Sequence, residues 1–399
     1  MSTLRRAGLA ALVAAPFAAA YRFALVYRVR AGYPRPRPPT ITPADVGLPF
    51  EDIVIEAPGA TLAAWFIPAR GGAPGPGVVL VHGWESARDR SLPTARFLNA
   101  AGFHCLAIDV RGHGSNPPES LPLSAGEFGT DALAGFAALL DRPEVTVGAI
   151  AGHSMGGIGA ILAAAADARV AAVVSTSAPA EPYRLTRQTF RLAHLPIPDP
   201  IAYPLAWLTT RVYLRPRGHA VPAISASSAV SRYAGRVLLI HGDADDVVPI
   251  SHLDRLARVA RTSRDGVADA KPVETLVVAG GHHSWLYEFP QYRGAVARFL
   301  STALGGPLGA DEAEWVAAGV PVTRIPDGGG TFGAVAAEPG GFRSLAAIAA
   351  GRARPRALPD EVAPPIDQAL EPPATADPRL APATDTRAAG PAPAGEPLR

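Results

Sequence analysis

The chain has 399 residues, and Gly (40) and Pro (42) together make up about a fifth of it, so part of this length is not expected to pack. Its 37 basic and 35 acidic residues argue against a dedicated nucleic-acid binder, and its single cysteine, Cys105, excludes a disulfide framework and a zinc site built on several thiolates. Collagen, coiled-coil and multi-span membrane proteins are also excluded, because the sequence has no matching period and no repeated apolar segment of spanning length.

An apolar segment, Ala7 to Tyr21, follows Arg5-Arg6. Its 15 residues are fewer than the roughly 20 that a membrane-spanning helix needs, but extension to Tyr27 gives 21. Aromatic and basic flanking residues favour a membrane anchor, small residues at 18–20 are compatible with a cleaved signal peptide, and an amphipathic or poorly ordered leader is the third interpretation. Because arginines cluster downstream, we expect membrane association on the cytoplasmic face, with export as the alternative.

Both ends of the chain differ in composition from the middle. Residues 1–47 comprise the leader and a linker with five prolines at 32–43. Residues 305–399 are rich in Gly, Pro and Ala, and residues 355–399 contain 11 prolines and no aromatic residue. Such a segment buries too little apolar area to offset its ordering entropy, so we expect a largely disordered tail with one short helix near 311–318.

The middle of the chain, residues 48–304, is predicted to form one domain. Short β-branched runs alternate there with Ala- and Leu-rich stretches, which indicates βαβ units and a mostly parallel eight-stranded sheet flanked by helices. The first two strands are candidates for an antiparallel start. The expected strands are 52–56, 62–67, 78–82, 104–108, 145–151, 170–176, 236–241 and 273–278, and the expected helices are 95–101, 131–140, 155–166, 253–260 and 291–304. The alternation is interrupted at about 181–231, where a helical cap insertion over the sheet edge is predicted.

The strongest local motif is Gly152-His153-Ser154-Met155-Gly156, which follows a predicted strand and opens a predicted helix. Small residues around Ser154 permit a sharp turn that raises its hydroxyl above the sheet edge, and the helix N-terminus supplies free N–H groups. We therefore expect Ser154 to be a nucleophile, the other interpretation being a glycine-rich turn with an incidental serine.

A serine nucleophile needs a base, and the base needs an orienting acid. Several carboxylates follow the strand at 236–241, namely Asp243, Asp245 and Asp246. The strand at 273–278 leads into a glycine-softened loop with adjacent histidines, His282 and His283. The chain order nucleophile, acid, histidine is the order expected for a strand–turn–helix nucleophile of this kind.

With these motifs, the sequence resembles the α/β-hydrolase superfamily over about residues 48–304, specifically its serine esterase, monoacylglycerol-lipase-like and serine-aminopeptidase-like members. Besides the serine motif, the resemblance rests on His82-Gly83-Trp84 and on the segment from Asp109 to Gly114. It implies the α/β-hydrolase fold, Asp245 as the acid, and His283 as the base in preference to His282. It also implies an oxyanion hole formed by the backbone N–H groups of Trp84 and Met155.

The expected function is a serine hydrolase that cleaves a carboxylic ester, of a lipid-like or small acyl group, through an acyl-enzyme intermediate. A serine peptidase or a thioesterase would use the same three residues and is the first alternative function. An acyltransferase or a non-catalytic binding protein is the alternative from a different functional class. The expected partner is a small acyl ester. No dinucleotide fingerprint lies between a strand and a helix and no metal-ligand spacing is evident, so neither a cofactor nor a metal is expected.

Overall fold

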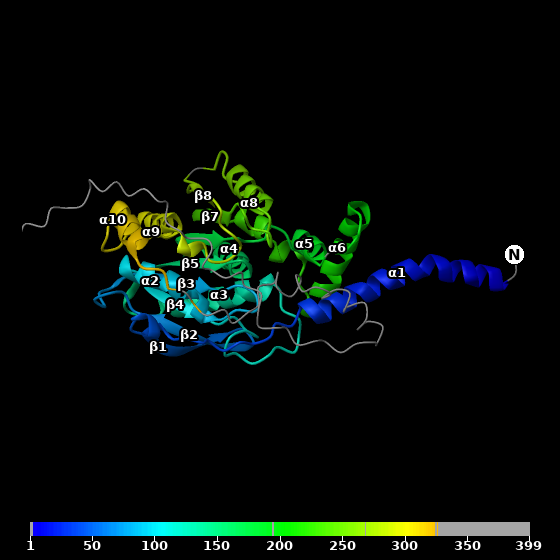
Figure 1. Cartoon of the computed structure of the whole chain (residues 1–399), viewed down its shortest axis with the longest axis horizontal. Coiled ribbons are helices and arrows are strands. Elements are labelled where there is room, and N and C mark those ends of the chain that lie inside the picture. The colour runs from blue at the N-terminus through cyan, green and yellow to red at the C-terminus, as the bar shows by residue number, and fades with distance from the viewer. Residues whose placement is uncertain (1–2, 194, 268, 324, 326–399) are drawn as a thin grey trace, which may run out of the picture. The chain divides into compact units, whose positions relative to one another are not determined.

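An eight-stranded sheet lies at the centre of the fold (Figure 1). The computed structural model describes residues 3–193, 195–267, 269–323 and 325. Strand order is β1-β2-β4-β3-β5-β6-β7-β8, and pairing is antiparallel for β1 with β2 and for β2 with β4, and parallel elsewhere. The mostly parallel sheet with an antiparallel start is therefore confirmed. The strands are β1 (Glu51–Ala57), β2 (Ala60–Ile67), β3 (Gly75–Val81), β4 (His104–Ile108), β5 (Val145–His153), β6 (Ala172–Thr176), β7 (Arg236–Gly242) and β8 (Val273–Val278).

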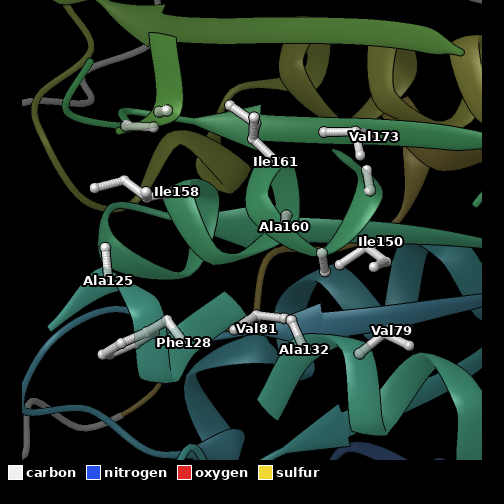
Figure 2. Close-up of a cluster of buried hydrophobic side chains, with 14 of the residues drawn as sticks. Val79, Val81, Ala125, Phe128, Ala132, Ile150, Ile158, Ala160, Ile161 and Val173 are labelled. Carbon is white, nitrogen blue, oxygen red and sulfur yellow. The ribbon is translucent and has the colours of Figure 1, made fainter. Parts of the chain in front are cut away.

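Helices cover both faces of the sheet, which explains why the central strands are near-continuous apolar runs. On one face α3 (Ala125–Leu140), α4 (Met155–Ala166) and α8 (Ser251–Thr262) contribute to one hydrophobic cluster. Figure 2 shows part of it, with Phe128 of α3 and Ile161 of α4 beside Val81, Ile150 and Val173 of the strands. On the other face α2 (Leu92–Ala100), α9 (Pro290–Leu304) and α10 (Ala310–Gly319) contribute to a second cluster.

Packing continues beyond Leu304, the domain boundary expected from the sequence. Helix α10 lies against α9, where the Arg293 side chain donates hydrogen bonds to the carbonyls of Ala317 (3.2 Å) and Ala318 (2.6 Å). The second cluster extends as far as Ile325. The rest of the tail that we expect to be disordered, residues 326–399, lies outside the described residues.

The insertion between β6 and β7 is helical. It contains α5 (Pro182–Leu192), α6 (Asp199–Leu214), the 3₁₀ turns Arg215–Arg217 and Val221–Ile224, and α7 (Ala226–Val230). The Gln188 amide of α5 donates a hydrogen bond to the Asp246 carbonyl (3.3 Å), so the insertion contacts the loop that follows β7. We call residues 181–224 the cap.

The N-terminal apolar segment lies within a single helix, α1 (Thr3–Ala31), whose C-terminal part packs against the cap (Figure 1). Phe23 and Tyr27 meet the Phe190 ring edge-on at centroid distances of 5.4 and 6.1 Å. By length and composition, the stretch Ala10–Ala31 of this helix is able to cross a membrane.

Candidate active site

Ser154 lies at the turn between β5 and α4, with backbone angles φ 55° and ψ −118°. This strained conformation persists because the flanking glycines let the chain pass very close to itself. A Cβ on Gly152 would lie 2.1 Å from the Gly156 carbonyl oxygen, and one on Gly156 would lie 2.2 Å from that of Val81. The turn therefore requires glycine at both positions and holds the Ser154 hydroxyl at the carboxyl edge of the sheet.

Three side chains from separate strand ends form a continuous hydrogen-bonded line. The Ser154 hydroxyl donates to Nε2 of His283 (3.0 Å), and Nδ1 of His283 donates to Oδ2 of Asp245 (2.8 Å). Because β5, β7 and β8 run parallel, the loops after them meet at one sheet edge. All three side chains are largely buried, and Ser154 is 6% exposed. The structure thus brings together the three residues expected from the sequence.

The alternative base, His282, lies elsewhere. It is exposed, and its Nδ1 donates to the Ala244 carbonyl (3.1 Å) instead of facing Ser154. The loop that carries Asp245 and the loop that carries His283 approach each other most closely at Gly242 and Gly281. A Cβ on Gly242 would lie 2.0 Å from the Gly281 carbonyl oxygen, so this approach requires glycine. Asp243 also joins these loops by accepting a hydrogen bond from the Gly280 N–H (2.7 Å).

The Asp245 carboxylate has one further histidine partner that the sequence did not reveal. Nε2 of His241, at the end of β7, lies 3.1 Å from Oδ2 of Asp245, and the backbone N–H groups of Val247 and Val248 donate to Oδ1 (3.0 and 2.7 Å). Burial alone would raise the pKa of Asp245, but the hydrogen bonds from His241, His283 and Val248 lower it below its ordinary value. Asp245 is therefore held as a carboxylate facing His283.

The loop after β3 lies beside the serine. A Cβ on Gly83 would lie 3.3 Å from Cβ of Ser154, so the loop that carries Trp84 passes close to the serine. Met155 is the first residue of α4, and its N–H therefore has no carbonyl one turn back within the helix. These are the two positions that we expect to form an oxyanion hole.

The other histidines near this edge support the loops. Nε2 of His153 donates to the His283 carbonyl (2.7 Å), and Nδ1 of His82 donates to the Gly83 carbonyl (2.7 Å). Nδ1 of His113 donates to the Arg111 carbonyl (2.9 Å). Burial lowers the pKa of His113 and of His153 to about 3, so both rings are neutral near neutral pH. Among the described residues, no group of three or more His, Cys, Asp or Glu side chains is placed to hold a metal ion.

Comparison with known proteins gives a family match. Residues 78–299, more than half of the chain, match the model described as the alpha/beta hydrolase family. Uncharacterized proteins from two strains of Mycobacterium tuberculosis are each 29% identical over 265 residues, which is 65% of this chain and 79% of the relative.

Among solved structures, the chain is similar to the esterase Pf2001 of Pyrococcus furiosus in two crystal forms. The TM-scores are 0.52 and 0.54, with identities of 22% and 21%. Each comparison covers 68% of this chain and nearly all of the esterase, 98% and 99%. At this level of identity the likeness shows the fold.

Proposed function

The chain belongs to the alpha/beta hydrolase family, and on that premise we propose that it is a serine hydrolase that cleaves a carboxylic ester through an acyl-enzyme intermediate. The observation that carries the proposal is the hydrogen-bonded line from Ser154 through His283 to Asp245. It supplies a nucleophile, a base within reach of its proton and a carboxylate that selects the tautomer of the base.

In the first half-reaction, the Ser154 hydroxyl oxygen attacks the ester carbonyl while Nε2 of His283 takes its proton. The N–H groups of Trp84 and Met155 donate hydrogen bonds to the oxygen that becomes negative. The tetrahedral intermediate then expels the alcohol, which leaves with the proton from His283, and the acyl group remains on Ser154.

In the second half-reaction, His283 removes a proton from water, and the resulting hydroxide attacks the acyl-enzyme. Collapse releases the carboxylic acid and returns the proton to Ser154. Asp245 remains ionised throughout and stabilises the imidazolium that forms twice in each cycle. Its lowered pKa suits that task.

We place the substrate among esters because solved structures that the chain resembles over 68% of its length are those of an esterase. The apolar length of α1 supports the further proposal that the chain is anchored to a membrane on its cytoplasmic face.

The experiment is a chain-length series of p-nitrophenyl esters measured beside aminoacyl amides. We expect turnover of esters, and a loss of about 10⁴-fold or more in kcat for Ser154→Ala. Ser284→Ala, the same change at a serine next to the base, is the matched control and should retain most of the activity. Preference for amides would reassign the substrate to peptides while keeping the triad, and full activity of Ser154→Ala would remove the mechanism.

A further inference from the structure

Helix α1 is joined to the cap by specific contacts. The Tyr27 hydroxyl lies 3.1 Å from Oγ1 of Thr189 in α5, and the Tyr213 hydroxyl of α6 donates to the Ala31 carbonyl (3.0 Å). Tyr27 is buried between the rings of Phe190 and Tyr213. These contacts hold the cap against the C-terminal part of α1. If α1 enters a membrane, the cap therefore lies at the membrane surface.

The length of α1 decides where that boundary lies. The uninterrupted apolar run from Ala7 to Tyr21 has 15 residues, which at the α-helical rise covers about 22 Å, less than the roughly 30 Å of a bilayer's hydrocarbon core. A spanning α1 must therefore be immersed as far as about Tyr27, with the Arg22 side chain extending toward the headgroups. At that level α1 is in contact with the cap.

The cap exposes apolar side chains beside this contact. Ile201, Tyr203 and Trp207 project from α6 into solvent, and Trp207 is 51% exposed. The Arg211 guanidinium lies 3.9 Å from the centroid of the Trp207 ring. Aromatic rings with arginine beside them are typical of the level of the lipid headgroups.

Charge is unevenly divided along the chain. Helix α1 and the cap together contain eleven arginines and two carboxylates, a net charge of +9, whereas the rest of the chain contains 26 basic and 33 acidic residues. Within this set Arg217 is ion-paired with Glu119 and Glu127 of the remaining chain, and Arg5 and Arg6 lie at the N-terminal end of α1. The other arginines outnumber the two carboxylates and accompany the exposed apolar side chains, a combination that favours binding to a surface with an apolar interior and anionic headgroups.

We propose that α1 and α6 form one docking surface for an anionic phospholipid bilayer, with α1 inserted and α6 lying at the headgroup boundary. Its apolar residues are Leu12, Val13, Phe17, Tyr21, Ile201, Tyr203 and Trp207. The cap then rests on the lipid, and the substrate class we infer for Ser154 is an acyl ester of a membrane lipid. The insertion of α1 and this last step rest on the proposed function, whereas the placement of α6 at the headgroups does not.

The position of α6 is tested with a polarity-sensitive fluorophore on Trp207→Cys in the full-length protein. The native Cys105 is fully buried and does not compete for the label. Trp315→Cys is the matched control, because Trp315 is also exposed (77%) but lies on α10. Protein is added to phosphatidylcholine vesicles with and without phosphatidylglycerol.

We expect the emission at position 207 to shift to shorter wavelength with phosphatidylglycerol vesicles and less with phosphatidylcholine alone, while the emission at 315 stays unchanged. Unshifted emission at 207, or an equal shift at 315, overturns the docking surface. An equal shift at 207 with both vesicle types overturns its preference for anionic lipid. None of these results depends on catalysis.

The substrate class is tested by comparing an ester-linked phospholipid in vesicles with a soluble short-chain ester. In the double variant Ile201→Ser and Trp207→Ser, the ratio of the lipid rate to the soluble rate should fall about tenfold, because bilayer contact is weakened. Trp315→Ser should leave this ratio unchanged. An unchanged ratio in the double variant overturns the lipid inference, whereas a wild-type protein inactive on both esters overturns the proposed function alone.

Discussion

The acid Asp245 receives side-chain hydrogen bonds from two histidines, and only one of them faces the serine. Nε2 of His241 lies near two acceptors, Oδ2 of Asp245 (3.1 Å) and the Val248 carbonyl (2.7 Å), so it must carry a proton. His241 therefore acts through Asp245 and is a positioning residue. It holds the carboxylate in the orientation that His283 needs.

We expect His241→Leu to lower kcat about tenfold with little change in KM, because a hydrogen bond to a charged group is lost. The acid limb of the pH profile of kcat/KM should move to higher pH, because an Asp245 carboxylate that has lost one hydrogen-bond donor interacts more strongly with the protonated form of its remaining partner, His283. His241→Gln retains an amide donor and should restore part of the rate. A pH profile that is the same in wild type and His241→Leu would show that His241 only fills space.

A functional residue is easiest to predict from the sequence when its role depends on the backbone conformation of its immediate neighbours. Ser154 was predictable because its flanking glycines and the strand–helix context lie within a few residues. The choice between His283 and His282 required the family resemblance, and the structure shows that it depends on the path of the loop at Gly280 and Gly281. His241 was missed because a histidine ending a strand carries no signal of its own; its position four residues before Asp245 was the one available hint.

The turn from β5 into α4 depends on the absence of a side chain at Gly156. A Cβ there would lie 2.2 Å from the Val81 carbonyl oxygen and 2.4 Å from that of His82, both of which are backbone atoms. We expect Gly156→Ala to destabilise the protein by about 3 kcal/mol, because α4 must move away from β3. Chemical denaturation measures this change.

Gly309→Ala is the matched control, because a Cβ there meets nothing within 4 Å. Its free energy of unfolding should change by less than about 0.5 kcal/mol. If both variants unfold at the same denaturant concentration, the close approach of α4 to β3 is not what requires glycine at position 156.

Buried strands and apolar helices could be predicted directly from the pattern of apolar residues in the sequence. The bounds expected for β4, β8 and α4 coincide with those observed. Helix α3 begins at Ala125, six residues earlier than expected, because Ser124 and Glu127 form a capping box in which the Ser124 N–H donates to the Glu127 carboxylate (2.7 Å). That Ser-x-x-Glu pattern was readable in the sequence.

The helices of the cap could not be placed from sequence in the same way. Helix α6 contains Pro204 within its span, and local rules treat an interior proline as a helix breaker. Its stability comes from tertiary contacts instead, since Ala202, Ala206 and Val212 are buried against neighbouring elements. Such contacts are not visible in a local pattern.

Burial lowers the pKa of several histidines among the described residues, including His113, His153 and His252. Desolvation lowers the pKa of His113 and His153 to about 3 and that of His252 to about 4, all below the ordinary value of 6.5. Between these values and 6.5 the unfolded chain binds protons that the folded chain does not. The free energy of unfolding should therefore fall as the pH falls through this range.

We expect each of these histidines to cost up to about 2 kcal/mol of stability at about pH 5. His113→Gln removes one of the groups that binds a proton in the unfolded chain but not in the folded chain. This variant should therefore show a smaller slope of the free energy of unfolding against pH. His282→Gln, at an exposed histidine, should leave it nearly unchanged. Denaturant titrations across the range measure these slopes, and identical slopes for wild type and His113→Gln would contradict the assignment of His113 as a buried neutral ring.

We propose above that the Ser154 hydroxyl is an activated nucleophile. Fluorophosphonate labelling followed by peptide mass spectrometry tests it most directly, because the probe reacts covalently with a serine whose proton is removed by a neighbouring base. We expect one adduct, on Ser154, that is lost in Ser154→Ala and forms much more slowly in His283→Gln. Wild-type protein that stays unlabelled at Ser154, or that is labelled at another serine, would contradict it.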